Sequence, residues 1–364
     1  DLWHSQANQT PTQIQASSAS PTLPVLGEGM LDQLRQTWRE ACMAFNEPEA
    51  ELATAKALSI DTPEVVCTQI LQKGLAELGE GWYAGNISIQ QEHFASTLVA
   101  RHLNALFAVA PIPTRPDRLL AACPPGEDHD LALLMLAFIL RWRGWEVIYL
   151  GADVPLEQLD ATLQATSPNL VLSVAQTLPG AASLKELAEF TNDRSIPLAY
   201  GGGIFNQIPD LATRIPGHFL SRQVDAAPQV VEHLLAFRPS RPALQPLPPA
   251  YVAALAGFRE KEALIVTRVC QILQSSPIDR RYVESANTHF TQAVVAALIL
   301  GEINVLDHSV EWLNGFLVNH GLSPTLAVQY YQAFHQAIQE QTGFQAGPVL
   351  DWLTRFEKNP GVQL

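Results

Sequence analysis

The sequence lacks the patterns that define membrane and secreted proteins. No apolar run approaches the ~20 residues that a membrane-spanning helix needs, and the stretch LALLMLAFIL at 131–140 ends at Arg141, as a buried helix would. The four cysteines form no CxxC pair and stand far apart, at Cys42, Cys67, Cys123 and Cys270. This spacing is typical of free thiols in a reducing compartment rather than of a disulfide framework. With no signal-peptide pattern after Asp1, we expect a cytoplasmic protein that makes no membrane contact.

Positive charge is also scarce. The chain carries 22 Lys and Arg against 36 Asp and Glu, a net charge of −14. A surface that binds nucleic acid needs a basic face to neutralise phosphates, so we expect no direct nucleic-acid partner. At 364 residues with 47% hydrophobic residues, the chain is long enough for two or three domains around a sizeable core.

The N-terminal third is predicted to be helical after a polar start. Residues 1–28 are rich in Gln, Ser, Thr and Pro, which is typical of a flexible lead-in. Within residues 29–112, apolar residues recur at spacings of three and four, which predicts a four-helix bundle. Pro63 suits the first turn of one helix. Ser88, with Gln91 three residues later, predicts a capping box at the start of another.

Strands and helices alternate within residues 116–237. Apolar strand patterns recur about every 25–30 residues with helices between them, which predicts right-handed crossovers and a parallel, doubly wound sheet. Such sheets bind ligands at the carboxyl ends of their strands. Four polar or Gly-rich segments fall there: GEDHDLA at 126–132, GADVP at 151–155, AQTLPG at 175–180 and GGGIFN at 201–206.

The last third is predicted to be a separate helical domain. Five prolines among the thirteen residues 238–250 are typical of a semi-rigid linker. Residues 251–364 again carry a helical pattern. The expected fold class is therefore α/β plus all-α: a four-helix bundle, a doubly wound parallel sheet of the Rossmann-like kind, and a C-terminal helical domain.

A single histidine stands among acids where the first strand gives way to a helix. The segment GEDHDLA places Glu127 and Asp128 before His129 and Asp130 after it. A neutral imidazole binds transition metals, and a neighbouring carboxylate fixes its tautomer. Since a zinc site would need three or four protein ligands, one histidine suits a metal that brings its own equatorial ligands, as in a tetrapyrrole. The spacing is equally compatible with ordinary acidic capping of a helix N-terminus.

The same segment resembles the DxHxxG motif of cobalamin-binding domains. The resemblance implies a domain in which His129 is the lower axial ligand of cobalt. Glu127 stands two residues before His129, where the motif has Asp, and Asp128 is the other candidate for the carboxylate partner, so the pairing stays open. Ala132 stands where the family has Gly. This adds one methyl group beside the nucleotide tail of the cofactor but removes no ligand.

Two further segments of that signature follow in order. In LSVAQT, Ser173 matches the serine that the family places near the displaced dimethylbenzimidazole, and Thr177 closes the segment. In YGGGIF, Gly201 and Gly202 match the glycine pair of the family and Gly203 follows them. The resemblance implies that these glycines let the nucleotide tail lie against the backbone, a close approach that glycine permits.

The predicted bundle carries a second signature. GEGWYAGNISIQQEHFAS places nine residues between Trp82 and the pair Glu92 and His93, which resembles the W-x9-EH signature of CarH-type light-sensing cobalamin domains. The resemblance implies that Trp82 packs against the upper adenosyl group of adenosylcobalamin, with Glu92 and His93 beside it. It also implies that His93 becomes the upper cobalt ligand after light breaks the cobalt–carbon bond. Without the resemblance, Trp82 could be plain core and the pair a solvated helix face.

The resemblance covers residues 31–237. CarH-type repressors carry a DNA-binding domain ahead of this core, whereas only the polar lead-in precedes it here. We therefore expect no transcription-factor output from these residues. The C-terminal helical domain makes the arrangement similar to the photocobilins instead, and that resemblance implies biliverdin as a second chromophore close to the cobalamin.

A bilin needs an apolar slot for its rings, and Arg, His or Tyr for its propionates and pyrrole groups. The C-terminal domain offers seven candidates: Arg280, Arg281, Tyr282, His289, Tyr330, Tyr331 and His335. Aromatic residues and histidines at helical spacing are more often core than chromophore contacts. Cys270, in an apolar segment, fits core filling better than a thioether bond.

The sequence thus favours a light sensor that depends on adenosylcobalamin, not an enzyme. Photolysis would change its quaternary structure, and biliverdin would be a second chromophore if the photocobilin resemblance holds. One alternative is a corrinoid protein that carries methyl groups in a methyltransferase system, and another is a cobalamin-binding adaptor without a light response. The cap residues favour the sensor, since they suit a bulky adenosyl group better than methyl transfer. We expect a homo-oligomer, either a dimer or a tetramer, whose output partner the sequence does not identify.

Overall fold

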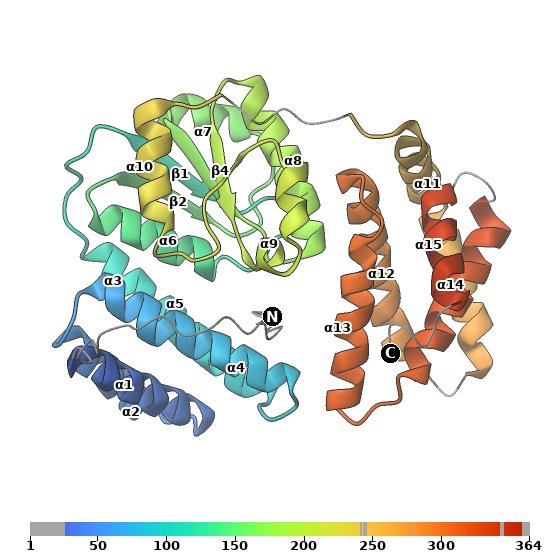
Figure 1. Cartoon of the computed structure of the whole chain (residues 1–364), viewed down its shortest axis with the longest axis horizontal. Helices are drawn as coiled ribbons and strands as arrows, with labels where there is room; N and C mark the ends of the chain where they lie inside the picture. The colour runs from blue at the N-terminus through green and yellow to red at the C-terminus, as the bar shows by residue number, and fades with distance from the viewer. Residues whose placement is uncertain (1–25, 241, 243–245, 277, 343–345, 359–364) are drawn as a thin grey trace, which may run out of the picture.

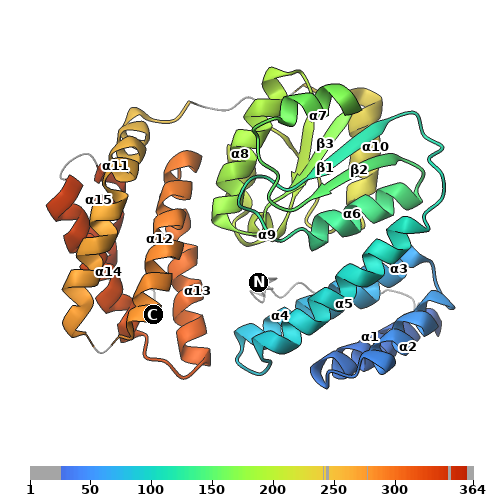
Figure 2. The same cartoon turned by 180° about the vertical axis from the view of Figure 1, so that it is seen from behind.

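The computed structural model describes residues 26–240, 242, 246–276, 278–342 and 346–358. Most of the predicted lead-in, residues 1–25, lies outside them. Figure 1 shows three groups of elements: N-terminal helices in blue, a sheet covered by helices in green, and C-terminal helices in orange and red. The strand arrows point toward the side where the N-terminal helices lie, and the C-terminal helices lie beside both other groups (Figures 1 and 2).

The N-terminal helices pack around one apolar core. α1 (Leu26–Met43) and α2 (Glu47–Leu58) are followed by a long composite helix and by α5 (Ile89–Ala108). Trp38 is fully buried among them. α1 begins at Leu26, three residues before the predicted boundary at residue 29.

The capping box predicted for α5 is confirmed. The backbone N–H of Gln91 donates to Oγ of Ser88 at 3.3 Å, and the backbone N–H of Ser88 donates to Oε1 of Gln91 at 2.8 Å. These two bonds satisfy donors that the first turn of a helix otherwise leaves open. The start of α5 is therefore fixed three residues before Glu92.

The third helix of the bundle is interrupted by a π-helical segment. It runs from α3 (Pro63–Val66) through the π segment Cys67–Gln72 to α4 (Lys73–Tyr83). A π turn widens the helix and loosens its backbone hydrogen bonding. Nη1 of Arg35 donates to the carbonyl oxygen of Gln69 inside this segment at 3.3 Å, so α1 supplies a hydrogen bond to the irregular turn.

The sheet has five parallel strands in the order β2-β1-β3-β4-β5. They are β1 (Arg118–Ala122), β2 (Glu146–Gly151), β3 (Leu170–Val174), β4 (Leu198–Gly201) and β5 (His218–Phe219). The order reverses direction between β1 and β3, and doubly wound sheets bind ligands at such a switch point. The loops that follow β1 and β3 carry the segments GEDHDLA and AQTLPG, so the switch point falls on the predicted site.

Helices cover both faces of the sheet. Apolar residues of α6 (Leu131–Trp142) and α10 (Ala227–Phe237) pack on one face, and those of α7 (Leu159–Thr166) and α8 (Leu178–Asp193) pack on the other. α6 also packs against the N-terminal bundle through its opposite side, which joins the two groups. After β4 the chain forms α9 (Gly203–Gln207) and a 3-10 turn at Pro209–Arg214. Pro209 prevents α9 from continuing, because proline has no N–H to donate.

The C-terminal helices pack around a largely aromatic centre, which is continuous with the apolar cluster of α7 and α8. The C-terminal helices are α11 (Pro249–Ile272), which ends in a 3-10 turn at Leu273–Ser275, α12 (Arg280–Leu300), α13 (Val305–Asn319), α14 (Thr325–Thr342) and α15 (Gly347–Lys358). Phe290, Phe334 and Trp352 pack in this centre. The predicted fold class, α/β plus all-α with a doubly wound parallel sheet, is confirmed.

The C-terminal helices dock on the sheet group through α12 and α8. Lys185 on α8 is only 8% exposed, and its Nζ donates to the carbonyl oxygen of Ile299 at 2.7 Å. Because Ile299 lies in the last turn of α12, the ammonium group also meets the negative end of the helix dipole. Arg214 donates to Glu302 at 2.9 Å just beyond that turn. The two groups therefore share a packed interface.

Candidate functional site

The loop after β1 is organised by one buried carboxylate. Oε1 of Glu127, which is fully buried, accepts from Nδ1 of His129 at 2.6 Å and from the backbone N–H of His129 at 3.1 Å. Oε2 accepts from the backbone N–H of Gln176 at 2.8 Å and from the N–H and hydroxyl of Thr177, both at 3.3 Å. The neighbouring Asp128 is exposed. The carboxylate partner of His129 is therefore Glu127.

This arrangement fixes the charge and the tautomer of the pair. Burial alone would raise the pKa of Glu127, but the hydrogen bond from His129 and the backbone N–H of Gln176 outweigh it and hold that pKa below its usual value. An ionised Glu127 can only accept hydrogen bonds, so Nδ1 of His129 carries the proton. The lone pair that binds a metal then lies on Nε2. The donor chemistry thus fits a histidine that ligates one metal from the rim of the sheet.

Gly180, in the first turn of α8, makes room for this carboxylate. A Cβ atom at Gly180 would collide with Oε2 of Glu127. Its backbone N–H donates to Oγ1 of Thr177 at 3.0 Å, which caps α8. We did not predict a role for Gly180. A glycine inside a helix costs stability relative to other residues, and that cost was the available sequence signal of a close approach.

Asp153, after β2, is a second residue that the sequence reasoning missed. Its Oδ1 accepts from the backbone N–H of Gly126 at 2.7 Å, and its own N–H donates to the carbonyl oxygen of Glu127 at 3.0 Å. Asp130 is tied to β2 as well, because the hydroxyl of Tyr149 donates to its Oδ2 at 2.6 Å. The loop that carries the histidine is therefore held from the neighbouring strand on both sides.

Ser173 and the glycine segment lie at the adjoining rim. Ser173 is buried on β3, and its hydroxyl donates to the carbonyl oxygen of Ala122 at 2.7 Å. Its predicted place beside the base of the cofactor stays a prediction. The hydrogen bond links β3 to the last residue of β1, directly before the loop of Glu127.

The three glycines after β4 differ in what requires them. Gly202 has a φ of +122°, and a Cβ there would collide with the carbonyl of Ala175. At Gly203 a Cβ would lie 2.8 Å from Oε1 of Gln176, which accepts from the N–H of Gly203 at 2.7 Å. At Gly201 the nearest described atom would be 3.8 Å away. Packing within the protein thus explains Gly202 and Gly203, whereas a Cβ at Gly201 would make only an ordinary van der Waals contact.

The predicted cap pair lies at the start of α5. Glu92 is buried, and its Oε2 accepts no hydrogen bond from any residue that the structure describes. Nδ1 of the half-exposed His93 lies 3.2 Å from that oxygen, outside hydrogen-bond geometry. Burying a carboxylate oxygen without a donor is costly, so the arrangement fits a ligand group that donates to Glu92.

Trp82, at the end of α4, lies against rings of the C-terminal helices. Its ring centroid is 6.5 Å from that of Trp312, 5.5 Å from that of Phe316 and 6.3 Å from that of His320, all on α13. These contacts come from the C-terminal helices rather than from the bundle, so this side of Trp82 packs between two domains. Its packing against an adenosyl group stays a prediction.

The structure does not bring the seven bilin candidates into one site. The first three lie exposed at the start of α12, where they are Arg280, Arg281 and Tyr282. His289 is exposed too, and its Nδ1 lies 2.7 Å from the carbonyl oxygen of Ser285. Inside the core, the other three are buried: Tyr330, Tyr331 and His335.

The buried candidates have partners within the core. The hydroxyl of Tyr330 donates to Oδ1 of Asn287 at 3.0 Å, and Nδ2 of Asn287 donates to Sγ of Cys270 at 3.4 Å. Nε2 of His335 lies 3.0 Å from Nε2 of Gln339. Burial raises the pKa of Tyr330 and Tyr331. These seven residues do not line a common pocket, and biliverdin binding therefore stays a prediction.

The four cysteines are free, and burial raises the pKa of Cys42 and Cys67 to about 12, so both are protonated thiols. Among the described residues, no three His, Cys, Asp or Glu side chains gather in a group that could hold a bare metal ion. No helix in that part of the chain is both long and apolar enough to cross a membrane.

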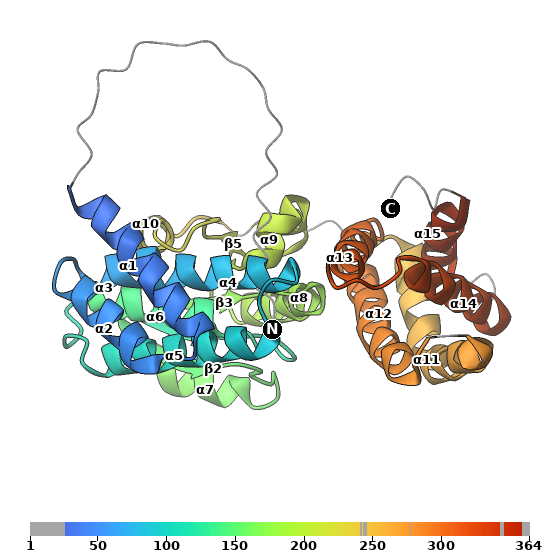
Figure 3. The ribbon, with the colours of Figure 1, turned by 90° about the horizontal axis from the view of Figure 1, so that it is seen from below.

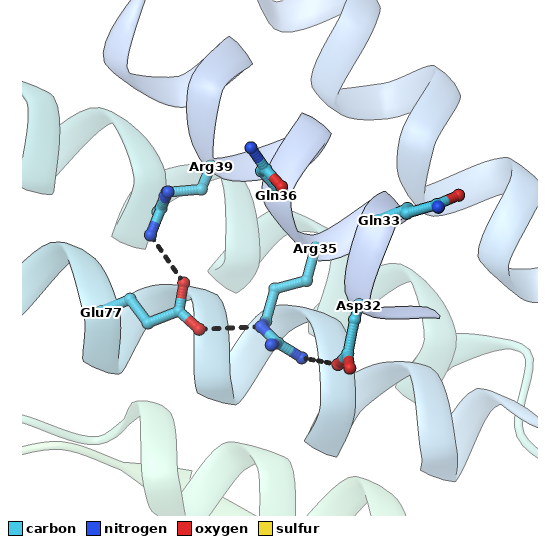
Figure 4. Close-up of a pocket in the computed structure, with 6 residues that line it drawn as sticks. All are labelled: Asp32, Gln33, Arg35, Gln36, Arg39 and Glu77. Atoms are coloured by element: carbon cyan, nitrogen blue, oxygen red, sulfur yellow. Dashed lines mark hydrogen bonds and ion pairs between the residues drawn. The ribbon is translucent and has the colours of Figure 1, made fainter. Parts of the chain in front are cut away.

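A polar pocket of about 300 Å³ opens between α1 and α4, and none of the predicted cofactor residues lines it (Figure 4). Its walls are Asp32, Gln33, Arg35, Gln36, Arg39 and Glu77. Glu77 accepts from Nε of Arg35 at 2.8 Å and from Nη1 of Arg39 at 3.0 Å, and Arg35 also donates to Asp32 at 2.7 Å. The two guanidinium groups are thus neutralised by two carboxylates, and we assign no ligand to this pocket.

Comparison with known proteins identifies the two halves of the core. Residues 34–106 and residues 118–230 each match a family described as a B12 binding domain. Over 174 residues the chain is 30% identical to the HTH-type transcriptional repressor CarH of Myxococcus xanthus. The matched segment covers 43% of this chain and 58% of that protein. Over 141 residues it is 30% identical to the HTH-type transcriptional repressor CarA of the same organism. That match covers 38% of this chain and 47% of CarA.

A third relative comes from a different class of protein. The chain is 28% identical over 113 residues to a methanol–corrinoid protein of Methanosarcina barkeri. The matched segment covers 30% of this chain and 43% of that protein. The chain thus spans between 43% and 58% of the length of these relatives.

The expectation of no direct nucleic-acid partner is wrong. It was based on the net charge of −14, but CarH and CarA, each 30% identical to this chain, are HTH-type transcriptional repressors. In helix-turn-helix proteins a dedicated recognition helix contacts DNA, so an acidic cobalamin-binding core does not report on DNA binding. Net charge therefore excludes no nucleic-acid partner here.

Proposed function

We propose that this chain, which carries a CarH-type cobalamin-binding core, is a light sensor that holds adenosylcobalamin between its helical bundle and its sheet. When bound, cobalamin supplies a cobalt atom whose bond to carbon is broken by light. The residues of the chain hold that group from two sides, exclude water from it and replace the ligand that is lost. Photolysis then changes the quaternary structure.

The observation that carries the proposal is the pair formed by Glu127 and His129. Its 2.6 Å hydrogen bond leaves the metal-binding lone pair on Nε2 of a histidine at the switch point of the sheet. A lone histidine suits a metal that arrives with its own equatorial ligands. Gly201, at which packing within the protein would tolerate a Cβ, would be required by the nucleotide tail. Ser173, Thr177, Gly202 and Gly203 complete this side of the site.

On the opposite side, Trp82, Glu92 and His93 would form the cap. The indole of Trp82 would shield the cofactor from water, and the buried Oε2 of Glu92, which has no hydrogen-bond donor among the described residues, would accept a hydrogen bond from it. His93, exposed on the next position of α5, would supply an imidazole to the cobalt on this side.

A corrinoid protein that carries methyl groups is the second candidate, and the methanol–corrinoid relative favours it. The two functions differ at the cap. A methyl carrier has to open its upper face to partner enzymes, whereas a sensor keeps an adenosyl group enclosed. The buried Oε2 of Glu92, without a donor among the described residues, supports the enclosed adenosyl group, whose ribose carries hydroxyl donors.

The decisive experiment loads the protein with adenosylcobalamin in the dark and then illuminates it with green light. We expect a lasting change in the cobalt spectrum and in the sedimentation coefficient of the wild type, and a different end spectrum for His93→Ala. Protein loaded with hydroxocobalamin, which has no cobalt–carbon bond, is the control. Binding without any light-dependent change would favour the methyl carrier or an adaptor.

The lower ligand is tested separately with His129→Ala. We expect a lower affinity for cobalamin or a bound cofactor that keeps its own base on cobalt, because the imidazole that displaces this base is gone. The exposed His233 on α10 supplies the control variant His233→Ala. Unchanged affinity and an unchanged spectrum for His129→Ala would contradict the assignment.

Biliverdin as a second chromophore, the homo-oligomeric state and the output partner are finer parts of the proposal. A far-red absorbance band after co-expression with a source of biliverdin would support the bilin. If no such band appears, the C-terminal helices are a docking or assembly element of the sensor.

A further inference from the structure

α13 of the C-terminal domain lies beside the end of α4, at the point where the bundle carries Trp82 (Figures 1 and 2). The contact is aromatic. Trp312 and Phe316 stack on each other with ring centroids 5.4 Å apart, and Phe316 packs on His320 at 4.1 Å. The indole of Trp82 lies against all three rings, so α13 forms a wall on one side of the tryptophan.

Hydrogen bonds fix the backbone of α4 against the same helix. Nε2 of His320 donates to the carbonyl oxygen of Trp82 at 3.2 Å. Nδ2 of Asn319 donates to the carbonyl oxygen of Tyr83 at 3.0 Å, and the hydroxyl of Tyr83 donates to the carbonyl oxygen of Trp312 at 3.4 Å. The carbonyl oxygen of Trp82 also accepts from the backbone N–H of Gly85 at 2.9 Å, so His320 adds a second hydrogen bond where α4 ends.

Glycine permits the close approach on both sides. A Cβ atom at Gly315 on α13 would collide with the hydroxyl of Tyr83. A Cβ at Gly85, just after α4, would lie 2.6 Å from the carbonyl oxygen of Asn319. Larger residues at either position would push the two helices apart. The geometry is therefore that of a specific contact, not of two surfaces that happen to meet.

The C-terminal domain also reaches the opposite side of the site. α12 docks on α8 through Lys185 and Ile299, and α8 begins beside Thr177, which holds the carboxylate of Glu127. α4, which ends after Trp82, and α8, which begins after Thr177, are thus both held by this domain, and Figure 3 shows both on the side that faces α12 and α13.

We propose that α13 positions Trp82 and thereby sets the environment of the upper face of bound cobalamin. Trp312 and Phe316 are then positioning residues of the site, although they belong to the C-terminal domain. The inference rests on the proposed function. Its physical basis is that an indole at a helix end keeps one rotamer only when other side chains enclose it, and α13 supplies the enclosing rings.

A double-mutant cycle between Trp82 and Phe316 tests this inference. The variants are Trp82→Phe, Phe316→Leu and the combination, each in the full chain loaded with adenosylcobalamin in the dark. One readout is the rate at which the cofactor leaves into an excess of a cobalamin scavenger, and the other is the visible circular dichroism of the bound corrin. We expect each single variant to raise the rate of cofactor release by about 2- to 10-fold, as the loss of one aromatic pair would. The double variant should release the cofactor only slightly faster than the faster of the two single variants.

Val318→Ala is the matched control, because Val318 lies on α13 but is 58% exposed. Trp312→Phe is a second test variant in case Phe316→Leu lowers the melting temperature of the protein. The inference is overturned if the test variants release cobalamin at the rate of Val318→Ala, or if the effects of Trp82→Phe and Phe316→Leu multiply independently. A wild type that binds no cobalamin would overturn the proposed function as well, whereas binding with unchanged variants overturns the inference alone.

Discussion

The two sides of the candidate site are built in different ways. On the side of the sheet, every oxygen of the Glu127 carboxylate already accepts hydrogen bonds from His129, Gln176 or Thr177. On the side of the bundle, the buried Oε2 of Glu92 accepts none from the described residues, and Trp82 depends on rings from α13. The first side is complete before a cofactor arrives, whereas the second is completed by a ligand and by another domain. Removal of a carboxylate should therefore lower stability on the first side and cofactor affinity on the second.

The largest effect is expected from Glu127→Ala. Removing the carboxylate leaves the buried N–H groups of Gln176 and Thr177 without an acceptor, so we expect the free energy of unfolding to fall by about 3–5 kcal/mol. Urea unfolding of the cobalamin-free protein measures it. The exposed neighbour provides the control, Asp128→Ala, for which we expect a change within about 0.5 kcal/mol. Equal losses of unfolding free energy for Glu127→Ala and Asp128→Ala would contradict the assignment of Glu127 as the buried partner of His129.

A smaller effect is expected on the other side, from Glu92→Gln. Because Oε2 of Glu92 accepts no hydrogen bond from the described residues, we expect the unfolding free energy of the cobalamin-free protein to change by less than about 0.5 kcal/mol or to rise. The rate at which adenosylcobalamin dissociates should nevertheless increase.

Glu77→Gln gives the contrast on α4. Glu77 accepts from Arg35 and Arg39 (Figure 4), and its loss should cost about 1 kcal/mol without a change in cobalamin dissociation. If Glu92→Gln destabilises the cobalamin-free protein more than Glu77→Gln does, the bundle side is as complete as the sheet side, and the comparison fails.

The smallest effect concerns pH and the edge of the sheet. Burial lowers the pKa of His218 on β5 from its ordinary 6.5. As the pH falls below 6.5, the unfolded chain binds a proton that the folded chain resists, so the stability drops and levels off below the folded pKa. Unfolding free energies at about pH 7.5 and about pH 5.5 should differ less for His218→Asn than for the wild type. An identical pH dependence in both proteins would show that His218 contributes nothing.

The sequence was sufficient for the architecture because local patterns determine it. Helical spacing predicted the bundle, the capping box at Ser88 was confirmed, and alternating strands and helices predicted the parallel sheet. The pairing of His129 was not predictable, because Glu127 and Asp128 are adjacent in sequence. Contacts from Asp153, Gln176 and Thr177 select Glu127, and these residues are distant in the chain.

In the C-terminal domain, residue type alone did not predict which side chains line a ligand site. Tyr330 and Tyr331 were candidates because bilins need such side chains, but apolar packing buries both in the helical core. The aromatic residues of α13 that meet Trp82 went unnoticed, since His320 lies 238 positions from its partner. No local pattern reports a contact over that separation.

The interface between α8 and α12 bears on how the chain can be divided. One continuous apolar cluster extends from the sheet through α8 into the C-terminal helices. A truncated chain that stopped at the proline-rich linker would return the ammonium group of Lys185 to water and uncover the hydrophobic side of its own helix. The sensor core and its C-terminal partner should therefore melt together in a calorimeter, as one cooperative unit rather than as separable modules.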